Sequence, residues 1–164
     1  MSYRRSAAAA IVYNNSLHIF GGYDGNTDRC LNASEIINEN GNVRKSTDLP
    51  MSLYYHAVTF VNDSFSIITG GTHGNWVFES KWFDPPHTKA SNLSWYFNHM
   101  TQKFSEGPVL LRGRIGHTSG TLVDKGTKEK IPIVAGGLDM HARPSARILD
   151  STEILFNGKW IEGE

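Results

Sequence analysis

The chain has little cysteine and no excess of charge of either sign. Cys30 is the only cysteine among 164 residues, so neither an internal disulfide nor a zinc site of several cysteines can form. This composition fits a reducing compartment such as the cytoplasm. The 16 Lys and Arg balance 16 Asp and Glu, and a net charge of zero argues against a binder of nucleic acid or of anionic membranes.

Long hydrophobic runs and helical periodicity are also missing. The longest apolar run, residues 7–13, is far below the roughly 20 residues that a membrane-spanning helix needs. No window combines a sustained helical period with helix caps. The sequence therefore predicts an essentially all-β protein without a transmembrane segment.

Two features favour secretion as an alternative. Arg4 and Arg5 precede the apolar run, as basic residues do in a short signal peptide or a twin-arginine leader. The sequence also holds four N-glycosylation sequons, which begin at Asn14, Asn32, Asn62 and Asn92. A secreted protein is therefore the alternative to a cytoplasmic one.

What the chain does contain is a threefold repeat. Three short runs of β-branched and aromatic residues each end in a double glycine, and each run is a predicted strand. The double glycines are Gly21-Gly22, Gly70-Gly71 and Gly136-Gly137, and the runs before them are 17–20, 65–69 and 131–135. Glycine at these positions allows backbone to approach backbone closely or to adopt a positive φ.

Each of these strands has three predicted neighbours in its unit. A first strand precedes it at 7–13, 56–61 or 117–123, and a third follows at 33–38, 79–84 or 151–156. The fourth strands open at Val43, Trp95 and Trp160. We expect hairpin turns at Asn14-Asn15 and Asn62-Asp63, since Asn and Asp accept positive φ, and a longer one at 124–130.

The repeated unit resembles the kelch repeat, and the resemblance covers nearly the whole chain. The matching features are a basic residue three before His, an apolar strand ending in Gly-Gly, a Glu-bearing strand and a Trp. They are carried by Arg5, Ala8, Tyr23-Asp24-Gly25 and Ser34-Glu35-Ile36 in unit one, by Leu49-Pro50, His56-Ala57, Phe83-Asp84-Pro85 and Trp95 in unit two, and by Gly107-Pro108, Arg114, His117, residues 151–154 and Trp160 in unit three. Departures are Ile37 and Val43 at the aromatic positions, Lys81 in place of Glu and Leu155 in place of Tyr.

The resemblance implies a kelch-type β-propeller built from blades of four antiparallel strands. The residues 1–164 would form a partial propeller with blades at 4–50, 51–107 and 108–164. Propellers usually close with four to eight blades, so three would leave two broad apolar blade faces open to water. We expect further blades of a longer protein to cover them, and two half-rings making six blades are the geometric alternative.

The candidate site lies at one side of the expected propeller. Because the strands alternate in direction, loops from second to third strands and loops between blades leave on the same side. Arginine binds carboxylates bidentately, which predicts a face for an acidic peptide of a partner protein. Its candidate residues are Arg29, Arg143, Arg147, Tyr23, Asn26, His73, Asn75, Trp76 and His141. Asp24, Asp28 and Asp139 share these loops and would neutralise them, while Arg5 and Arg114 are expected to pack inside.

No pattern for catalysis or for a cofactor is found. The seven histidines show no pair at metal-ligand spacing, His56 and His117 occupy the repeat's own His positions, and a lone Cys30 is usually inert. We therefore expect a protein-interaction module. The kelch resemblance implies the recognition part of a cullin-type ubiquitin ligase adaptor or a cytoskeletal binder. A propeller enzyme of the sugar oxidase or sialic acid epimerase type, or a secreted kelch ectodomain, is the alternative.

Overall fold

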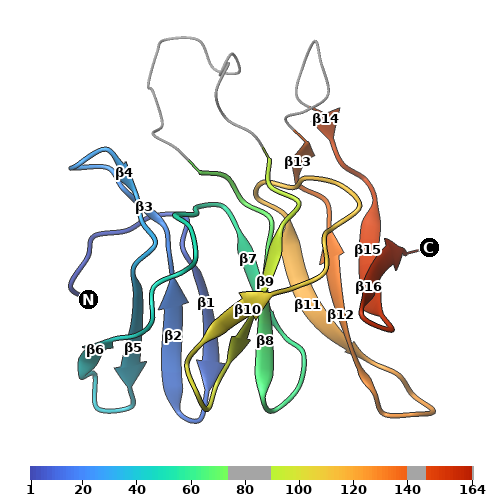
Figure 1. Cartoon of the computed structure of the whole chain (residues 1–164), viewed down its shortest axis with the longest axis horizontal. Helices are drawn as coiled ribbons and strands as arrows, with labels where there is room; N and C mark the ends of the chain where they lie inside the picture. Colours follow the sequence, from blue (N-terminus) through green and yellow to red (C-terminus); the bar gives the residue numbers. More distant parts are fainter. Residues whose placement is uncertain (74–89, 140–146, 164) are drawn as a thin grey trace.

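The computed structural model describes residues 1–73, 90–139 and 147–163, and every regular element in them is a β-strand. The prediction of an all-β protein is confirmed. Three antiparallel sheets of four strands follow one another along the chain, and Figure 1 shows the second between the other two. The described residues form no helix, and hence none long and apolar enough to cross a membrane.

Strand order within each sheet follows chain order, so each sheet is a simple up-and-down meander. The first sheet contains β1 (Ala9–Tyr13), β2 (Ser16–Phe20), β5 (Ser34–Asn38) and β6 (Val43–Lys45). The second contains β7 (Ala57–Phe60), β8 (Phe65–Thr69), β9 (Ser94–Asn98) and β10 (Phe104–Glu106). The third contains β11 (Thr118–Val123), β12 (Lys130–Ala135), β15 (Thr152–Phe156) and β16 (Lys159–Glu162).

The hairpin turns have two different physical origins. Asn14 and Asn15 adopt φ of 45° and 54°, as predicted for a tight turn between β1 and β2. The turn at Asn62 works differently, since neither it nor Asp63 has a positive φ. The Asn62 side-chain Oδ1 instead accepts the backbone N–H groups of Ser64 and Phe65 at 2.9 and 3.0 Å.

One strand prediction is wrong. Residues 79–84, expected as the third strand of unit two, lie outside the described residues, and the strand that pairs with β8 is β9. Trp95 therefore lies on a third strand, opposite Ile68, rather than at the opening of a fourth. Trp95 and Phe97 stand two residues apart on β9, and both side chains reach the core, as expected of an inner strand. The long segment between β8 and β9 had hidden this pattern in the sequence.

The corrected register changes which residues are equivalent among the sheets. Glu35 and Glu153 lie opposite Ile19 and Val134, and the second sheet has Trp95 at that position. Lys81 is therefore not the counterpart of these glutamates. Likewise Phe104 lies opposite Phe97 as Trp160 lies opposite Leu155, so Phe104 is the counterpart of Trp160.

Buried ion pairs stabilise the first and third sheets. Arg5 is 2.8 Å from Glu35 and Arg114 is 3.0 Å from Glu153, with all four side chains at most 2% exposed. Burial alone would raise the pKa of Glu35, but the Ser2 backbone N–H and the Arg5 guanidinium together hold that pKa below its usual value. These arginines face the interior, as expected.

The second sheet replaces this ion pair by an apolar pair. Leu53 stands three residues before His56, as Arg114 stands before His117, and both Leu53 and Trp95 belong to one buried cluster. Replacing a buried salt bridge by well-packed apolar groups is often neutral or stabilising. The same position in the fold is therefore held by charge in two sheets and by packing in one.

The core consists of two layers, one on each face of the second sheet. Phe20 packs with Leu53, Ile68, Trp95 and Phe97 between the first and second sheets. The layer between the second and third sheets contains the residues Ile67, Leu110, Val134, Leu155 and Trp160. The second sheet is thus covered on both faces, whereas the first and third sheets each have one face that no described element covers.

Candidate interaction surface at the loop end

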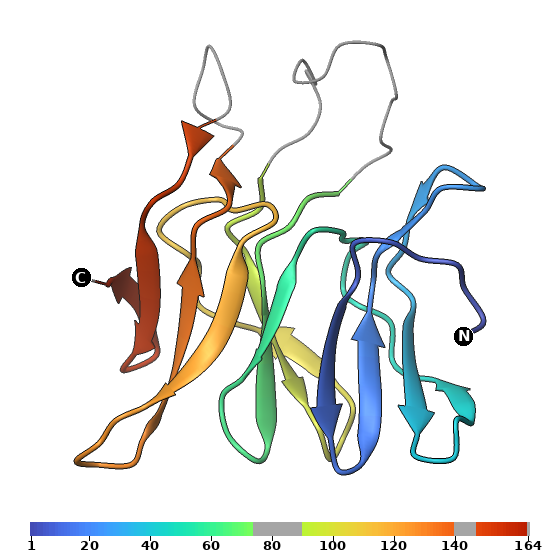
Figure 2. The same cartoon turned by 180° about the vertical axis from the view of Figure 1, so that it is seen from behind.

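The two ends of the sheets differ in character. Figures 1 and 2 show one end, here called the loop end, with the links between sheets and the segments β3 (Tyr23–Asp24), β4 (Arg29–Cys30), β13 (Leu138–Asp139) and β14 (Arg147–Ile148). Short hairpins such as those at Asn14 and Asn62 lie at the other, the hairpin end. Irregular loops on a rigid scaffold are where binding residues concentrate, so the loop end is the candidate site.

Two small ribbons project from the loop end. One pairs β3 with β4, and the other pairs β13 with β14. Each follows a glycine pair, and the residue after that pair bridges back to the strand entry of its own sheet, as Tyr23 does to Ser6. The ribbons are therefore anchored extensions of the sheets.

Five of the predicted site residues fall in the described part of this end. Asn26, Arg29, His73 and Arg147 are exposed, and Tyr23 is half-buried. The other four predicted residues lie outside the described residues, and they are Asn75, Trp76, His141 and Arg143. The described residues thus place two exposed arginines at the loop end, one on each ribbon.

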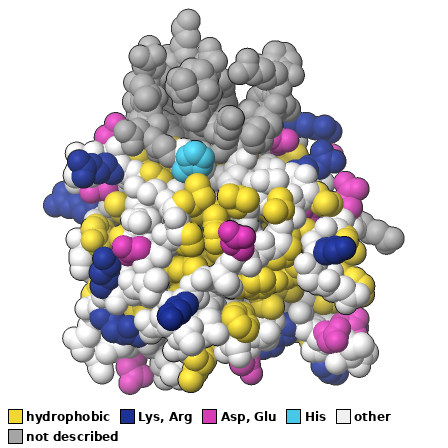
Figure 3. All heavy atoms as spheres, viewed as in Figure 1, with side chains coloured by type: hydrophobic (Ala, Val, Ile, Leu, Met, Phe, Trp, Pro, Cys, Tyr) yellow, Lys and Arg dark blue, Asp and Glu magenta, His cyan; other side chains and the backbone are white. Residues whose placement is uncertain are grey.

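Each of these arginines has an aspartate across its ribbon. Asp24 is the register partner of Arg29, and Asp139 is the register partner of Arg147. The pKa of Asp24 is lowered by the backbone N–H of Asn26 and the hydroxyl of Thr27, so its carboxylate is charged at neutral pH. Figure 3 shows Lys or Arg and Asp or Glu side chains close together on both sides of the loop end, which is mixed in charge.

Tyrosines give the loop end an aromatic component that sequence reasoning missed in part. The Tyr23 ring lies 5.3 Å from that of Tyr54, which in turn lies 5.4 Å from that of Tyr55. Burial raises the pKa of Tyr54 to about 12, while Tyr55 is 43% exposed. The Tyr23 hydroxyl is hydrogen-bonded to the Asp28 carboxylate. The consecutive tyrosines before His56 were the available signal.

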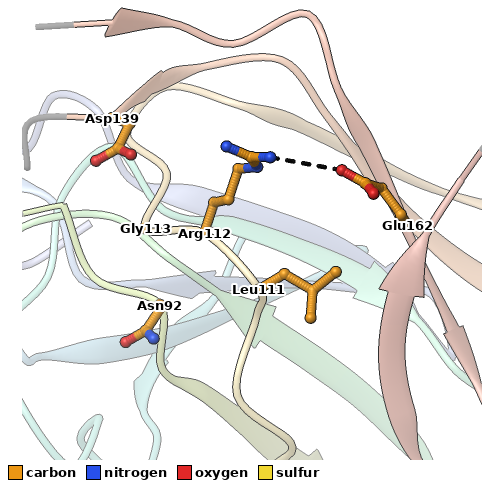
Figure 4. A pocket seen from close by; sticks show the side chains of 6 residues that line it. All are labelled: Asn92, Leu111, Arg112, Gly113, Asp139 and Glu162. Carbon is orange, nitrogen blue, oxygen red and sulfur yellow. Dashed lines mark hydrogen bonds and ion pairs between the residues drawn. The ribbon is translucent and has the colours of Figure 1, made fainter. Parts of the chain in front are cut away.

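A cavity of about 570 Å³ opens beside the third sheet (Figure 4). It is lined by Asn92, Leu111, Arg112, Gly113, Asp139 and Glu162. Arg112 points toward Glu162 at 3.5 Å, and these side chains are 40% and 65% exposed, so water and salt screen the pair. Arg112 was not among the predicted site residues.

The described residues hold no cluster of metal ligands, and the rings of His56 and His117 are neutral. In residues 1–73, 90–139 and 147–163 no group of three or more His, Cys, Asp or Glu could hold a metal ion. Burial lowers the pKa values of His56 and His117 to about 4, so both rings are neutral at pH 7. The His117 Nε2 lies 2.9 Å from the Thr69 Oγ1, which ties the ring to the preceding sheet.

The observations define an all-β protein of successive four-stranded antiparallel sheets, packed face to face, with a mixed-charge loop end. No family model and no curated protein matches the chain. Among solved structures, the structure of YjhT matches with a TM-score of 0.69 and 13% identity, over 97% of this chain and 51% of that chain. The two share a fold, and this chain spans about half the length of the YjhT chain.

Proposed function

We propose that the chain is a protein-interaction module, a three-blade segment of a kelch-type β-propeller that recognises a partner protein through its loop end. The three in-register Gly-Gly units and the three successive four-stranded antiparallel sheets support the propeller assignment. The single observation that carries the function is the asymmetry of the two ends. The links between sheets, the two ribbons and the cavity beside Asp139 lie at one end, while the hairpins between neighbouring strands lie at the other.

The partner that suits this surface best is an acidic segment with a few aromatic or apolar residues. Arg29 and Arg147 stand exposed on separate ribbons, and Arg112 borders the cavity. Arg112 can exchange its exposed Glu162 neighbour for a carboxylate of the partner, because exposed ion pairs are worth little. Tyr23 and Tyr55 supply the aromatic surface that interfaces favour.

A recognition role of this kind fits the settings that the kelch resemblance implies. In a cullin-type ubiquitin ligase adaptor, the loop end would select the substrate protein. In a cytoskeletal binder, it would hold a filament protein. Both uses need the same chemistry at the loop end, so one binding experiment tests the surface for either.

The test is binding of a fluorescent Glu-rich peptide, measured by anisotropy at low and at high salt. We expect saturable binding that weakens with salt, and none to the matched peptide with Gln in place of Glu. The Arg29→Glu/Arg147→Glu variant should lose at least tenfold in affinity. Lys125→Glu/Lys128→Glu makes the same charge change at the hairpin end and should bind as the unchanged protein does.

Equal losses in both variants would mean that net charge alone attracts the peptide, and the loop end would be rejected as the site. Binding of Gln and Glu peptides with equal affinity would reject the acidic partner. Turnover of a sugar substrate by the purified protein would replace the binding module by the enzymatic alternative.

A further inference from the structure

The first and third sheets each expose a face with a row of apolar side chains. On the first sheet the register aligns Val12, Leu17, Ile37 and Val43, of which Val12 is 66% and Val43 37% exposed. On the third sheet it aligns Gly120, Ile133, Ile154 and Ile161, and Ile161 is 41% exposed. Leu122 and Phe156 extend this second row at 51% and 48% exposure. Rows of this kind are normally covered.

The counterparts of both rows are covered where the chain supplies a neighbouring sheet. Phe97 and Phe104 stand in the second sheet where Ile37 and Val43 stand in the first, and both pack against the preceding sheet. In the third sheet the same positions are held by Leu155 and Trp160, which are again packed against the preceding sheet. The exposed row of the first sheet thus corresponds to the face with which the second and third sheets pack against the sheet before them, here called the entry side. The chain makes this interface twice.

The exposed row of the third sheet corresponds to the face with which a sheet packs against the sheet after it, here called the exit side. Ile67 and Tyr96 of the second sheet occupy the positions of Ile133 and Ile154, and they pack against the third sheet. In the first sheet Ile11, on the first strand, belongs to the corresponding row, and its side chain packs in the layer against the second sheet. One chain therefore presents both halves of a repeated contact, at opposite flanks (Figure 1).

The surroundings of the glycine pairs differ between a sheet that has a following neighbour and the third sheet, which has none among the described residues. A Cβ on Gly70 would lie 2.6 Å from the Arg114 carbonyl oxygen and 2.6 Å from the His117 ring, both belonging to the following sheet. A Cβ on Gly136, whose φ of +66° is similar, would meet nothing nearer than the Leu149 carbonyl oxygen at 3.7 Å. Of the two roles expected for these glycines, Gly136 has the positive φ but not the close approach, because no described sheet lies against it.

We propose that the exposed face of the third sheet binds the exposed face of the first sheet in a second copy of this chain. Two copies related by a twofold axis satisfy both faces at once, because each exit side meets the other copy's entry side. The result is a closed ring of six sheets. This chain covers 51% of the YjhT chain, so the rest of that chain is long enough for a second set of sheets of similar length. This proposal does not depend on the partner of the loop end.

The existing interface specifies contacts in the pair. The hydroxyls of Thr59 and Thr121 lie 3.2 Å apart where β7 passes β11. Their counterparts by register are Gly120 on the exit side and Val12 on the entry side. Position 120 of one copy should therefore lie beside position 12 of the other.

The backbone contacts repeat in the same way. Gly71 N–H donates to the Arg114 carbonyl at 2.8 Å, and Gly22 N–H donates to the Leu53 carbonyl at 2.8 Å. Gly137 N–H of one copy should donate to the Arg5 carbonyl of the other. Each copy thus contributes one donor and one acceptor to the two new interfaces.

The first measurement is the solution mass by light scattering over a hundredfold range of concentration. We expect a discrete species of twice the 18.3 kDa chain mass. A species of single-chain mass at every concentration would overturn the proposal, as would a mass that grows without limit, since heterologous contacts that fail to close make open chains.

Cross-linking tests the orientation. In a Cys30→Ser background, Val12→Cys and Gly120→Cys proteins are mixed and treated with a short thiol-to-thiol cross-linker. The mixture should give a linked dimer, and each variant alone should not. Linkage within single-variant solutions, or none in the mixture, would refute the arrangement. Thr59→Cys/Thr121→Cys in one chain is the positive control for reach, since it should link internally without a change in mass.

A surface variant separates assembly from folding. Ile161→Lys places a charge on the exit face of an edge strand and should convert the pair to single chains, with an unchanged circular dichroism spectrum. Val123→Lys makes the same change at a residue 58% exposed on the other face of the third sheet, and it should leave the pair intact. A pair that survives Ile161→Lys would overturn the proposal.

Discussion

The buried Arg114–Glu153 pair gives the sharpest stability prediction. Arg114 is 0% exposed and donates to the Gly136 and Ser151 carbonyls at 2.7 and 2.9 Å, besides its 3.0 Å ion pair with Glu153. Arg114→Leu leaves the Glu153 carboxylate buried without its counter-charge. Breaking such a pair by removing one partner costs about 3–5 kcal/mol, a large part of the roughly 5–15 kcal/mol that holds a domain folded.

The second sheet supplies the compensating change, because it holds Leu53 and Trp95 at the two positions. The double variant Arg114→Leu/Glu153→Trp should therefore recover part of the loss. Some cost persists, since two carbonyls lose the Arg114 donor and the backbone N–H groups of Leu111 and Arg112 lose the Glu153 acceptor. Glu153→Trp alone leaves a buried arginine unpaired and should be as destabilising as Arg114→Leu.

The assay is urea unfolding of the four proteins, followed by circular dichroism at one protein concentration so that association does not vary. The four free energies of unfolding form a double-mutant cycle, in which we expect a coupling of more than 2 kcal/mol between positions 114 and 153. Two single losses that simply add, or a loss below about 1 kcal/mol for Arg114→Leu, would refute the equivalence of the two kinds of pair.

Further predictions concern the glycines and the histidines. In the Ile161→Lys background, Gly70→Ala should be far more destabilising than Gly136→Ala, which should cost only the roughly 1–2 kcal/mol of a left-handed alanine, by urea unfolding. Comparable losses would contradict the open surroundings of Gly136. Stability should fall as pH drops from 6.5 toward 4, since burial lowers the pKa values of His18, His56 and His117 to about 4 and the unfolded chain then binds more protons. Urea midpoints at pH 7 and 5 measure this, and equal midpoints would refute it.

Much of the strand pattern followed from local chemistry. The glycine pairs, the Asn14-Asn15 turn and the alternation in the first and third units placed β1, β2, β5, β11, β12 and β15 within a few residues of their observed bounds. These signals are local because a tight turn and a two-residue period depend only on neighbouring side chains.

The third and fourth strands of the second unit were mispredicted for a physical reason. The Glu position of that unit holds Trp95 and its Arg position holds Leu53, so the charged marks of the repeat are absent. Trp95 was therefore assigned to the fourth strand, where Trp160 lies in the third unit. An ion pair and an apolar pair are interchangeable in a packed interior, but they look unrelated in a sequence.

The candidate site was only partly within reach of the sequence. Strand alternation predicted the end at which Arg29 and Arg147 lie, since loops of one type must leave an antiparallel sheet on the same side. The aspartates opposite them, the contact of Tyr54 with Tyr23 and the cavity beside Arg112 depend on how ribbons and sheets pack. Such contacts join residues far apart in the chain.

The sequence by itself determined the class of secondary structure, the threefold repeat and the end that carries the loops, because these depend on periodicity, turn residues and strand direction. The tertiary structure alone decided which strand is third in the second sheet, that Arg114 pairs with Glu153, and that Gly70 is crowded while Gly136 is open. Those outcomes depend on which sheet lies next to which, and face-to-face packing brings together side chains that no local pattern connects.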